Sequence, residues 1–205
     1  MGGEAELRRA DLASDPLEQF RSWFDEAGAA LEVPEGMALA TATPGGAPSV
    51  RMVLLKGFDE RGLVFYTHRT SRKGRELEAN PQAALLFHWS PLGRQVRVEG
   101  TIEHVSDEDS DAYFATRPRD AQLGARASRQ SEPLGSRAEL DERLAELESD
   151  LGRGSVARPT SWGGFRLVPA AWEFWQHRAS RLHDRFRYER EPSGEGGWRI
   201  ERLFP

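Results

Sequence analysis

The hydrophobic pattern first predicts a helix near the N-terminus. Apolar side chains recur there at the three- and four-residue spacing that places them on one helix face. Asp15 stands where a helix cap is expected, and Pro16 occupies the first helical position, where its missing N–H costs nothing. The pattern therefore predicts a helix over 16–31, with an apolar face formed by Leu17, Phe20, Phe24, Ala27 and Leu31.

Most of the remaining pattern is typical of short strands. Val96, Val98 and Gly100 alternate with polar positions, which is the period of a strand with one buried face. Several of these segments are joined by turns rich in glycine, which favours an antiparallel meander over parallel crossovers. Strands are expected at 37–43, 49–56, 63–67, 83–89 and 94–105, with another resuming at Phe165 and a closing hairpin over 185–203.

Helices interrupt this series of strands. Ser71 caps a short helix that stops at Asn80, Ser106 caps a second that runs to Thr116, and Ser136 opens a third with leucines on one face. The pattern predicts a mainly β fold with helical additions (α+β), an antiparallel β-barrel in a single domain over 1–205.

Charge and composition narrow the classes of function. The 205 residues include 28 Lys and Arg against 33 Asp and Glu, a formal net charge of -5, so we expect no nucleic-acid partner. The absence of cysteine excludes disulfides, thiolate metal sites and cysteine nucleophiles. No apolar run reaches the roughly 20 residues of a membrane-spanning helix, and the first residues show no secretory signal pattern. We therefore expect a cytoplasmic protein that does not bind a membrane.

Basic side chains in this acidic chain gather where they would suit a phosphate group. Arg51 and Lys56 lie on one predicted strand. Arg72 and Lys73 follow Ser71 at a helix start, where free backbone N–H groups also favour an anion. A capped surface helix with exposed basic residues is the alternative interpretation of this second pair.

Further polar residues lie in or beside the later strands. Gln95 faces inward, so its amide is either tied to the backbone or contacts a polar heterocycle. In an extended chain Arg181, His183 and Arg185 would point the same way, which favours an anion or an electron-rich ring over them. A solvated strand edge with Asp184 as counter-ion is the alternative.

Other kinds of site find no support in the sequence. The histidines show no metal-ligand spacing, so we expect no metal site. The glycine-rich phosphate loops of P-loop and dinucleotide-binding proteins are absent, as is the serine elbow of the α/β-hydrolases. No carboxylate pair stands isolated in an apolar strand, as a glycosidase site would require.

A series of short motifs extends over almost the whole chain, from about Leu7 to Pro205. These motifs are Arg51-Met-Val-Leu-Leu-Lys56, Phe65-Tyr-Thr67, Ser71-Arg-Lys-Gly74, Arg94-Gln-Val-Arg-Val-Glu-Gly100, Tyr113-Phe114, Arg117-Pro118, Gln130-Ser131, Trp162-Gly-Gly164, Phe174-Trp-Gln176, Arg181-Leu-His-Asp-Arg185 and Arg202-Leu203. In order and spacing they resemble the pyridoxamine/pyridoxine 5′-phosphate oxidases, a family of FMN enzymes.

The resemblance implies a split β-barrel of Greek-key-like antiparallel topology that forms a homodimer, with two FMN sites at the subunit interface. By resemblance, one subunit holds FMN through Arg51, Met52, Val53, Leu54, Leu55, Lys56, Tyr66, Thr67, Arg72 and Lys73. The site is closed, mostly from the other subunit, by Gln95, Gln130, Ser131, Trp175 and Arg185.

The same resemblance implies the substrate, a phosphorylated B6 vitamer, and its contacts. Lys56, Tyr113 and Arg117 would bind its phosphate, while Arg181 and His183, the expected catalytic residues, would face the pyridine ring near the reacting carbon. The implied reaction moves a hydride from the 4′ carbon of pyridoxine or pyridoxamine 5′-phosphate to flavin N5 and yields pyridoxal 5′-phosphate. O2 then reoxidises the flavin and becomes H2O2.

Three residues depart from the family pattern. Ala121 stands where the family usually supplies a serine hydroxyl, His177 where glycine is usual, and Arg126 where a large apolar residue is common. Two alternatives therefore stand beside the oxidase. One is a related FMN oxidase with another substrate, as in phenazine biosynthesis, and the other is a non-catalytic flavin- or vitamer-binding protein.

Overall fold

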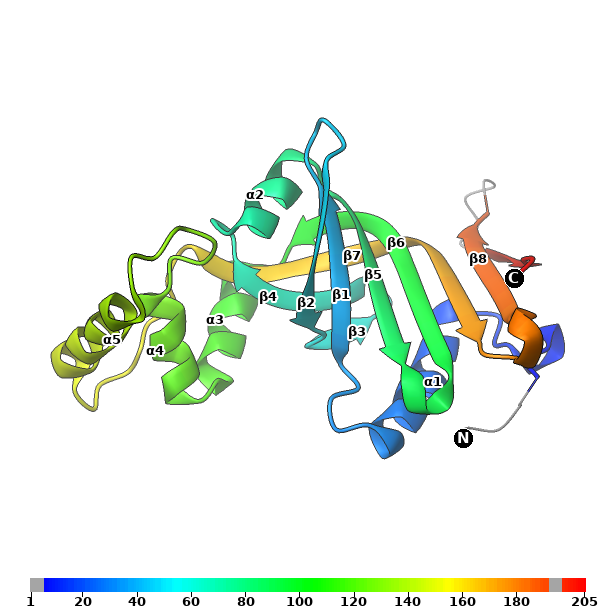
Figure 1. The fold of residues 1–205 in the computed structure, drawn as a ribbon, viewed down its shortest axis with the longest axis horizontal. Coiled ribbons are helices and arrows are strands. Elements are labelled where there is room, and N and C mark those ends of the chain that lie inside the picture. Colours follow the sequence, from blue (N-terminus) through cyan, green and yellow to red (C-terminus); the bar gives the residue numbers. More distant parts are fainter. Residues whose placement is uncertain (1–5, 192–196) are drawn as a thin grey trace.

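The fold, a computed structural model that describes residues 6–191 and 197–205, is built around one curled antiparallel sheet (Figure 1). The sheet follows the order β2-β1-β5-β6-β7-β4-β3, and β8 and β9 continue it beside β7. Its strands are β1 Gly36–Ala42, β2 Pro48–Leu54, β3 Gly57–Asp59, β4 Gly62–His68, β5 Gln82–Trp89, β6 Arg94–His104, β7 Trp162–Gln176, β8 Asp184–Arg190 and β9 Trp198–Arg202. The mainly β, antiparallel fold predicted from the sequence is confirmed.

The long strand β7 makes the sheet curl. Its first half pairs with β4, its second half pairs with β8, and β6 runs along nearly its whole length. The pairing with β6 shifts register between Glu99 and Gly100. A Cβ atom at Gly100 would lie 2.0 Å from the Val168 carbonyl oxygen, so only glycine permits this approach. Such a bulge increases the local twist and lets one strand serve two parts of a half-barrel.

The α-helices other than α4 begin where the sequence places their caps. The helices are α1 Pro16–Ala30, α2 Arg72–Ala79, α3 Asp107–Thr116, α4 Arg119–Ala127 and α5 Arg137–Leu151, with short 3-10 turns at Arg9–Asp11, Ser90–Leu92 and Ala179–Arg181. Asp15 accepts a hydrogen bond from the Leu17 N–H, and Ser71 accepts one from the Gly74 N–H. Each such cap satisfies a backbone donor that the helix itself leaves free.

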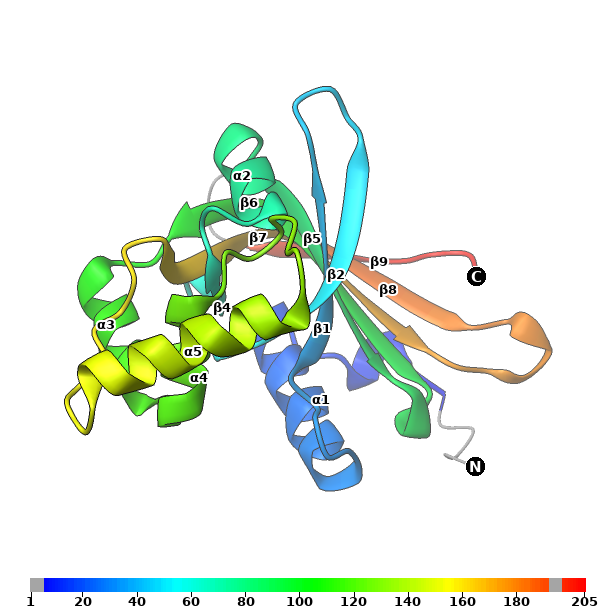
Figure 2. The same cartoon turned by 60° about the vertical axis from the view of Figure 1, so that its left-hand side comes forward.

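An aromatic core joins α1 to the inner face of the sheet. The fully buried ring of Phe20 lies 5.0 Å from Phe87 and 5.4 Å from Trp172, and Trp23 meets Phe174 edge-on at 5.3 Å. Rings at these separations add pairwise attraction to the gain from burying their area. This packing fixes α1 against one end of the sheet, at the opposite side of the molecule from α3, α4 and α5 in Figure 1, and Figure 2 shows α1 below β1.

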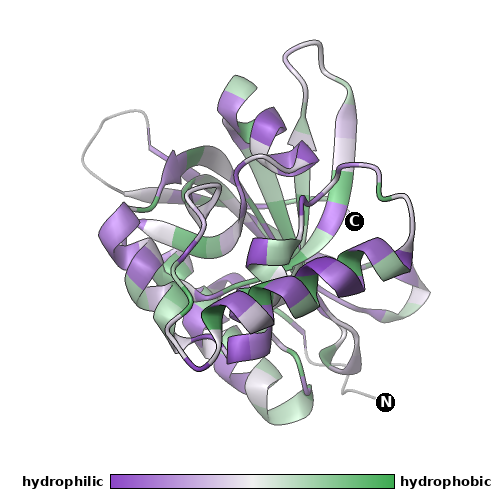
Figure 3. Cartoon of the chain, turned by 90° about the vertical axis from the view of Figure 1, so that its left-hand side faces the viewer, coloured by the Kyte–Doolittle hydropathy of each residue, from purple (hydrophilic) through white to green (hydrophobic). Residues whose placement is uncertain are grey.

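A second apolar cluster lies at the opposite end. It gathers Phe114 of α3, Leu123 of α4, Val156 and Trp162, with leucines of α5 packed against it. Figure 3 looks onto these helices and shows alternating hydrophilic and hydrophobic bands, as expected for helices with one face on a core. The cluster places α3 and α4 beside the start of β7.

Two elements escape the sequence prediction. Pro118 ends α3, as expected, but it is also the N-cap residue of α4, which the sequence pattern did not predict. The three-residue strand β3 is too short to show a period.

The two arms of the C-terminal hairpin are β8 and β9, while residues 192–196 of its turn lie outside the described part of the chain. In the residues that the structure describes, no helix combines the length and the apolar character needed to span a membrane.

Candidate active site

A cavity of about 750 Å³ lies where β2 and β4 meet α2, α3 and α4. One wall of the cavity is a stack of aromatic rings. The ring centroids of Tyr66 and Tyr113 lie 4.1 Å apart, and Trp162 stacks on Tyr66 with 5.3 Å between centroids. The cavity is lined by Met52, Val53, Leu54, Lys56, Tyr66, Thr67, His68, Lys73, Tyr113, Thr116, Arg117, Pro118, Ala121, Gly124, Ala125, Ser128, Gln130 and Trp162. A flat apolar wall with several cations is suited to an anionic ring compound.

Lys73 brings a buried cation to this cavity from the start of α2. Its Nζ donates to Gln130 Oε1 at 2.8 Å and to Thr67 Oγ1 at 3.2 Å. Burial, with the positive charge of Arg51 in addition, lowers the pKa of Lys73 to about 8. Both partners of the ammonium are neutral, so an anion at this point would stabilise its charged form.

Arg117, which follows α3, supplies a second cation. Its guanidinium lies 4.9 Å from the Trp162 ring centroid and 5.5 Å from that of Phe114. Burial lowers the pKa of Arg117, and its Nη1 is buried without a hydrogen-bond partner in the described residues. A buried donor without a partner costs about 1–3 kcal/mol, more when charged. The cavity therefore contains a donor suited to an anionic ligand.

Lys56 lies just beyond the end of β2, with its Nζ 4.0 Å from Glu35 Oε1, and lines the same cavity. His68 also lines it, and burial together with the charges of Lys73 and Arg117 lowers the pKa of His68. The structure thus brings Lys56, Tyr113 and Arg117, the three residues expected at the substrate phosphate, into one cavity with Lys73.

Arg51 and Arg72 lie outside this lining and converge on the buried carboxylate of Glu76. Arg51 donates to Glu76 and to the hydroxyls of Thr41 and Ser49, and Arg72 Nε donates to Glu76 Oε1 at 2.9 Å. Burial alone would raise the pKa of Glu76, but the hydrogen bonds it accepts outweigh burial and lower it to about 2. Glu76 therefore fixes both arginines, a role that the sequence analysis missed.

The remaining residues that the sequence analysis expected at FMN are more scattered. Gln130 lies with Lys73, as described, whereas Leu55 belongs to the apolar core and Ser131 is exposed with a positive φ of 77°. Gln95, Trp175 and Arg185 come together on β6, β7 and β8, where they line a separate recess of about 200 Å³ with Leu86, Arg97 and Glu173.

Arg181 and His183 do not extend from β8 as expected. The interpretation of Arg181, His183 and Arg185 as one extended face is wrong, because Ala179–Arg181 forms a 3-10 turn in which Ser180 and Arg181 have positive φ values of 58° and 62°. Arg181 is exposed. This turn sets Arg181 apart from the strand.

The imidazole of His183 packs against the Trp175 ring, 4.4 Å between centroids, with His177 5.2 Å away. Its Nδ1 accepts the Arg178 N–H at 3.1 Å, which assigns the proton of the neutral ring to Nε2. Burial lowers the pKa of His183, and His177 and Arg181 act in the same direction.

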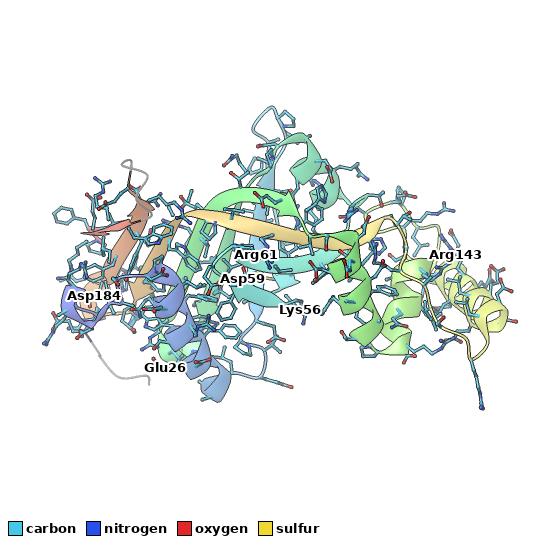
Figure 4. All side chains as sticks on the ribbon, turned by 180° about the vertical axis from the view of Figure 1, so that it is seen from behind. Glu26, Lys56, Asp59, Arg61, Arg143 and Asp184 are labelled. Atoms are coloured by element: carbon cyan, nitrogen blue, oxygen red, sulfur yellow. The ribbon has the colours of Figure 1, made fainter. Side chains whose placement is uncertain are left out.

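Two groups of predicted residues thus lie apart within one chain. Figure 4 shows Lys56 of the cavity and Asp184, the neighbour of His183, well separated along the molecule. Alternate residues of β2, Val50, Met52 and Leu54, are exposed to 69%, 67% and 43% and form an apolar stripe, of which Met52 and Leu54 also line the cavity. An exposed apolar patch of this kind marks an interaction surface.

Sequence reasoning assigned no role to Trp162, although it begins one of the quoted motifs. Gly164, two residues after it, permits the stack, because a Cβ there would lie 2.7 Å from the Tyr66 ring.

The three residues that depart from the family pattern lie in different places. Ala121 lines the cavity, Arg126 donates to the Ala157 carbonyl, and His177 packs beside His183. No metal-binding group of His, Asp and Glu side chains occurs in the described residues.

The fold and the cavity together define a split-barrel protein whose site suits a phosphorylated ring. A family profile described as pyridoxamine 5′-phosphate oxidase matches residues 24–149, and one described as the pyridoxine 5′-phosphate oxidase C-terminal dimerisation region matches residues 162–205. The chain belongs to the pyridoxamine 5′-phosphate oxidase family, as the sequence motifs predicted.

Relatives and solved structures agree with this assignment. The pyridoxine/pyridoxamine 5′-phosphate oxidase of Rubrobacter xylanophilus is 59% identical over 100% of this chain and 95% of its own length. The PhzG structure from Burkholderia lata, in complex with tetrahydrophenazine-1-carboxylic acid, has a TM-score of 0.90 at 34% identity and covers 99% of this chain and 100% of its own. A pyridoxamine 5′-phosphate oxidase-related, FMN binding protein from Nostoc punctiforme shares the fold, with a TM-score of 0.73 at 19% identity over 95% and 99% of the two chains.

The residues present fit FMN, the cofactor that this family implies. The lowered pKa of Lys73 marks a place where an anion such as the FMN phosphate would stabilise buried positive charge. The stacked wall of Tyr66, Tyr113 and Trp162 offers flat apolar area to a ring.

Proposed function

We propose that this protein is an FMN-dependent oxidase that converts pyridoxine 5′-phosphate and pyridoxamine 5′-phosphate to pyridoxal 5′-phosphate in the cytoplasm, with O2 reduced to H2O2. Family membership and the names of relatives 50–59% identical to the chain support this activity. The structural observation that carries it is the buried, unpartnered Arg117 Nη1 in a cavity that also contains Lys56 and Lys73. Two phosphorylated compounds, cofactor and substrate, would account for these separate cations.

FMN would supply the hydride acceptor and, once reduced, the reductant of O2. In this proposal Lys73 and Thr67 bind its phosphate, while Arg51 and Arg72, held by Glu76, add positive charge nearby. Gln95, Trp175 and Arg185 contact the flavin from the second recess.

A second set of residues, separate from those that bind FMN, binds the substrate in this proposal. Lys56, Tyr113 and Arg117 bind its phosphate, and the aromatic wall excludes water from the ring. His183, neutral above its lowered pKa, presents the proton on Nε2, and Arg181 contributes a cation. These residues position the reacting ring, and positioning of this kind supplies much of the acceleration when a cofactor carries the chemistry.

The two separated groups form a complete site if a second copy supplies one of them. The dimerisation profile over residues 162–205 covers β7 and β8, which carry Trp175 and Arg185. The apolar stripe of Val50, Met52 and Leu54 is exposed on β2 and would be covered by the partner. We infer a homodimer in which each FMN site combines the cavity of one subunit with the recess of the other.

A related FMN oxidase of the phenazine-biosynthesis type is the second candidate, because the Burkholderia lata PhzG structure contains tetrahydrophenazine-1-carboxylic acid. Its 34% identity is well below the 50–59% of the relatives named for the phosphorylated vitamers. The phosphate-binding set of Lys56, Tyr113 and Arg117 also favours the vitamers.

The deciding experiment mixes the FMN-loaded protein anaerobically with each candidate substrate and follows flavin absorbance. Pyridoxine and pyridoxamine 5′-phosphate should bleach the flavin and give aldehyde, and air should then restore the colour with H2O2 formed. Unphosphorylated pyridoxine is the matched control and should react far more slowly. A flavin that stays oxidised with both phosphorylated vitamers contradicts the proposal. Bleaching only by tetrahydrophenazine-1-carboxylic acid would instead identify the second candidate, and vitamer binding without bleaching would identify a binding protein.

A further inference from the structure

The recess on β6, β7 and β8 contains two charged residues to which no role has been assigned. Gln95, Trp175 and Arg185 are the flavin contacts proposed above, and Arg97 and Glu173 line the same recess between them. The strand register places Arg97 opposite Glu173, and Trp175 opposite Arg185. Arg97 and Glu173 are therefore part of the surface that the proposed function presents to the flavin.

Glu173 joins the two arginines of this recess. Its side chain is buried, and Arg185 Nε donates to its Oε1 at 2.8 Å while Arg97 Nη2 donates to its Oε2. Arg185 Nη1 donates to the Phe204 carbonyl at 3.0 Å, which leaves Nη2 as the nitrogen of Arg185 without an assigned contact. The carboxylate thus orients Arg185 and also offsets its charge.

Glu173 also belongs to a longer row of alternating charges across the outer face of the sheet, which begins at Arg185. Arg97 continues to Glu99, which pairs with Arg187 at 3.0 Å, and Arg187 pairs with Glu189 at 2.8 Å. Arg199 pairs with Glu189 and with Glu201 beyond it. Opposite charges balance along this row, so the loss of a single member leaves a net charge beside its neighbours.

We propose that Glu173 tunes the electrostatic environment of the flavin by offsetting the positive charge that Arg97 and Arg185 bring to the recess. The inference rests on the proposed FMN function. Reduction places negative charge on a flavin, so positive charge nearby raises its reduction potential and negative charge lowers it. A fixed carboxylate between two guanidinium groups offsets one of the two positive charges that line the recess.

The variant Glu173→Gln tests this directly, because the amide keeps the shape and a hydrogen-bond acceptor but removes the charge. The midpoint potential of protein-bound FMN is measured anaerobically against a reference dye. We expect the ratio of reduced to oxidised flavin at fixed potential to rise at least threefold, about 14 mV for a two-electron couple. The variant Arg97→Gln should shift the ratio in the opposite direction, because it leaves Glu173 with one arginine fewer.

Glu189→Gln is the matched control. It makes the same charge change in the same row, four positions from Arg185 along β8, or roughly 13 Å of strand. We expect its ratio to change by less than 1.5-fold. A shift as large as that of Glu173→Gln would mean that the net charge of the protein, and not the recess, sets the potential, and would overturn the inference.

The variants Glu173→Gln and Arg97→Gln together decide the test. An unchanged or lowered potential in Glu173→Gln overturns the proposal. If that variant does not retain FMN, Arg97→Gln decides alone: a lowered potential supports the proposal, and an unchanged or raised one overturns it. Failure of the unmodified protein to bind FMN would instead contradict the proposed function, so the two failures are distinguishable.

Discussion

The guanidinium of Arg117 lies over the ring of Trp162, 4.9 Å from its centroid, and its buried Nη1 has no hydrogen-bond partner within the described residues. The ring holds the cation in place through a contact that needs no counter-ion. Trp162 begins β7 and Arg117 follows α3, so this contact links the sheet to the helical end of the molecule. It leaves positive charge available at the cavity, where a phosphate would be bound.

Replacing Arg117 by Gln should weaken binding of the phosphorylated vitamers selectively. A hydrogen bond to a charged group contributes about 1.5–3 kcal/mol, so KM should rise about 10- to 150-fold with a smaller change in kcat. Steady-state kinetics with pyridoxine 5′-phosphate and with unphosphorylated pyridoxine would measure the difference. The exposed Arg137, which pairs with Asp141, supplies the control Arg137→Gln. An equal loss for both substrates would contradict a phosphate contact.

FMN affinity should depend on pH through Lys73. The pKa of this ammonium is lowered to about 8, and a bound phosphate would raise it again, so FMN binding takes up a proton above pH 8. Affinity should therefore fall as pH rises above about 8, at most about tenfold per pH unit. Fluorescence titration of the apoprotein with FMN between pH 7 and 10 would show this. The variant Lys73→Met should bind more weakly and lose this slope, and a slope that persists would assign it to another group.

The buried carboxylate of Glu76 should stabilise the fold in a pH-dependent way. Its pKa is about 2, below the ordinary value of 4.5, so its stabilising effect is complete above about pH 4.5 and is lost as pH falls towards 2. Glu76→Gln should lower the free energy of unfolding by about 1–3 kcal/mol at pH 7, because charge-assisted hydrogen bonds are lost. Urea denaturation at pH 7, 4 and 3 would show the difference between the variant and the unmodified protein shrinking with acidity. A constant difference would mean that the carboxylate charge is not involved.

Arg72 and Arg181 should divide cofactor binding from turnover. Arg72 donates to Glu76 beside the proposed phosphate site, whereas Arg181 lies on the turn next to His183. Arg72→Ala should weaken FMN retention with little effect on the turnover of the loaded enzyme, and Arg181→Ala should do the reverse. Equilibrium dialysis of FMN and anaerobic flavin reduction measure the two properties. Equal losses of FMN in both variants would contradict the division.

Local signals in the sequence explain which elements were predictable. The caps Asp15, Ser71 and Ser106 act within their own helix, so the sequence shows each helix start. By contrast, Pro118 ends one helix and precedes another, and the pattern indicates only the first of these roles. The turn at Ser180 and Arg181 requires positive φ values that neither residue type favours, so it depends on the surrounding structure.

The candidate site was predictable only in part for a similar reason. Spacing indicated basic clusters, and the family resemblance supplied their roles, but the partners of each cluster come from distant elements. Glu76 meets Thr41 of β1 and Arg51 of β2, and Glu173 meets Arg97 of β6. No short-range pattern reports such pairings, because the curl of the sheet brings them together.

The apolar stripe on β2 should control both dimer formation and FMN retention. Val50 is 69% exposed on β2 and belongs to this stripe, but unlike Met52 and Leu54 it does not line the cavity. Val50→Glu would place a charge in the proposed interface, where desolvation costs several kcal/mol. Analytical ultracentrifugation should show a shift from dimer to monomer, accompanied by loss of bound FMN, because in the proposed dimer each site draws residues from both subunits. Val33→Glu, at a 51% exposed position in the loop after α1, is the matched control and should leave both properties unchanged. A monomeric variant that keeps FMN with unmodified affinity would show that one chain holds the cofactor alone.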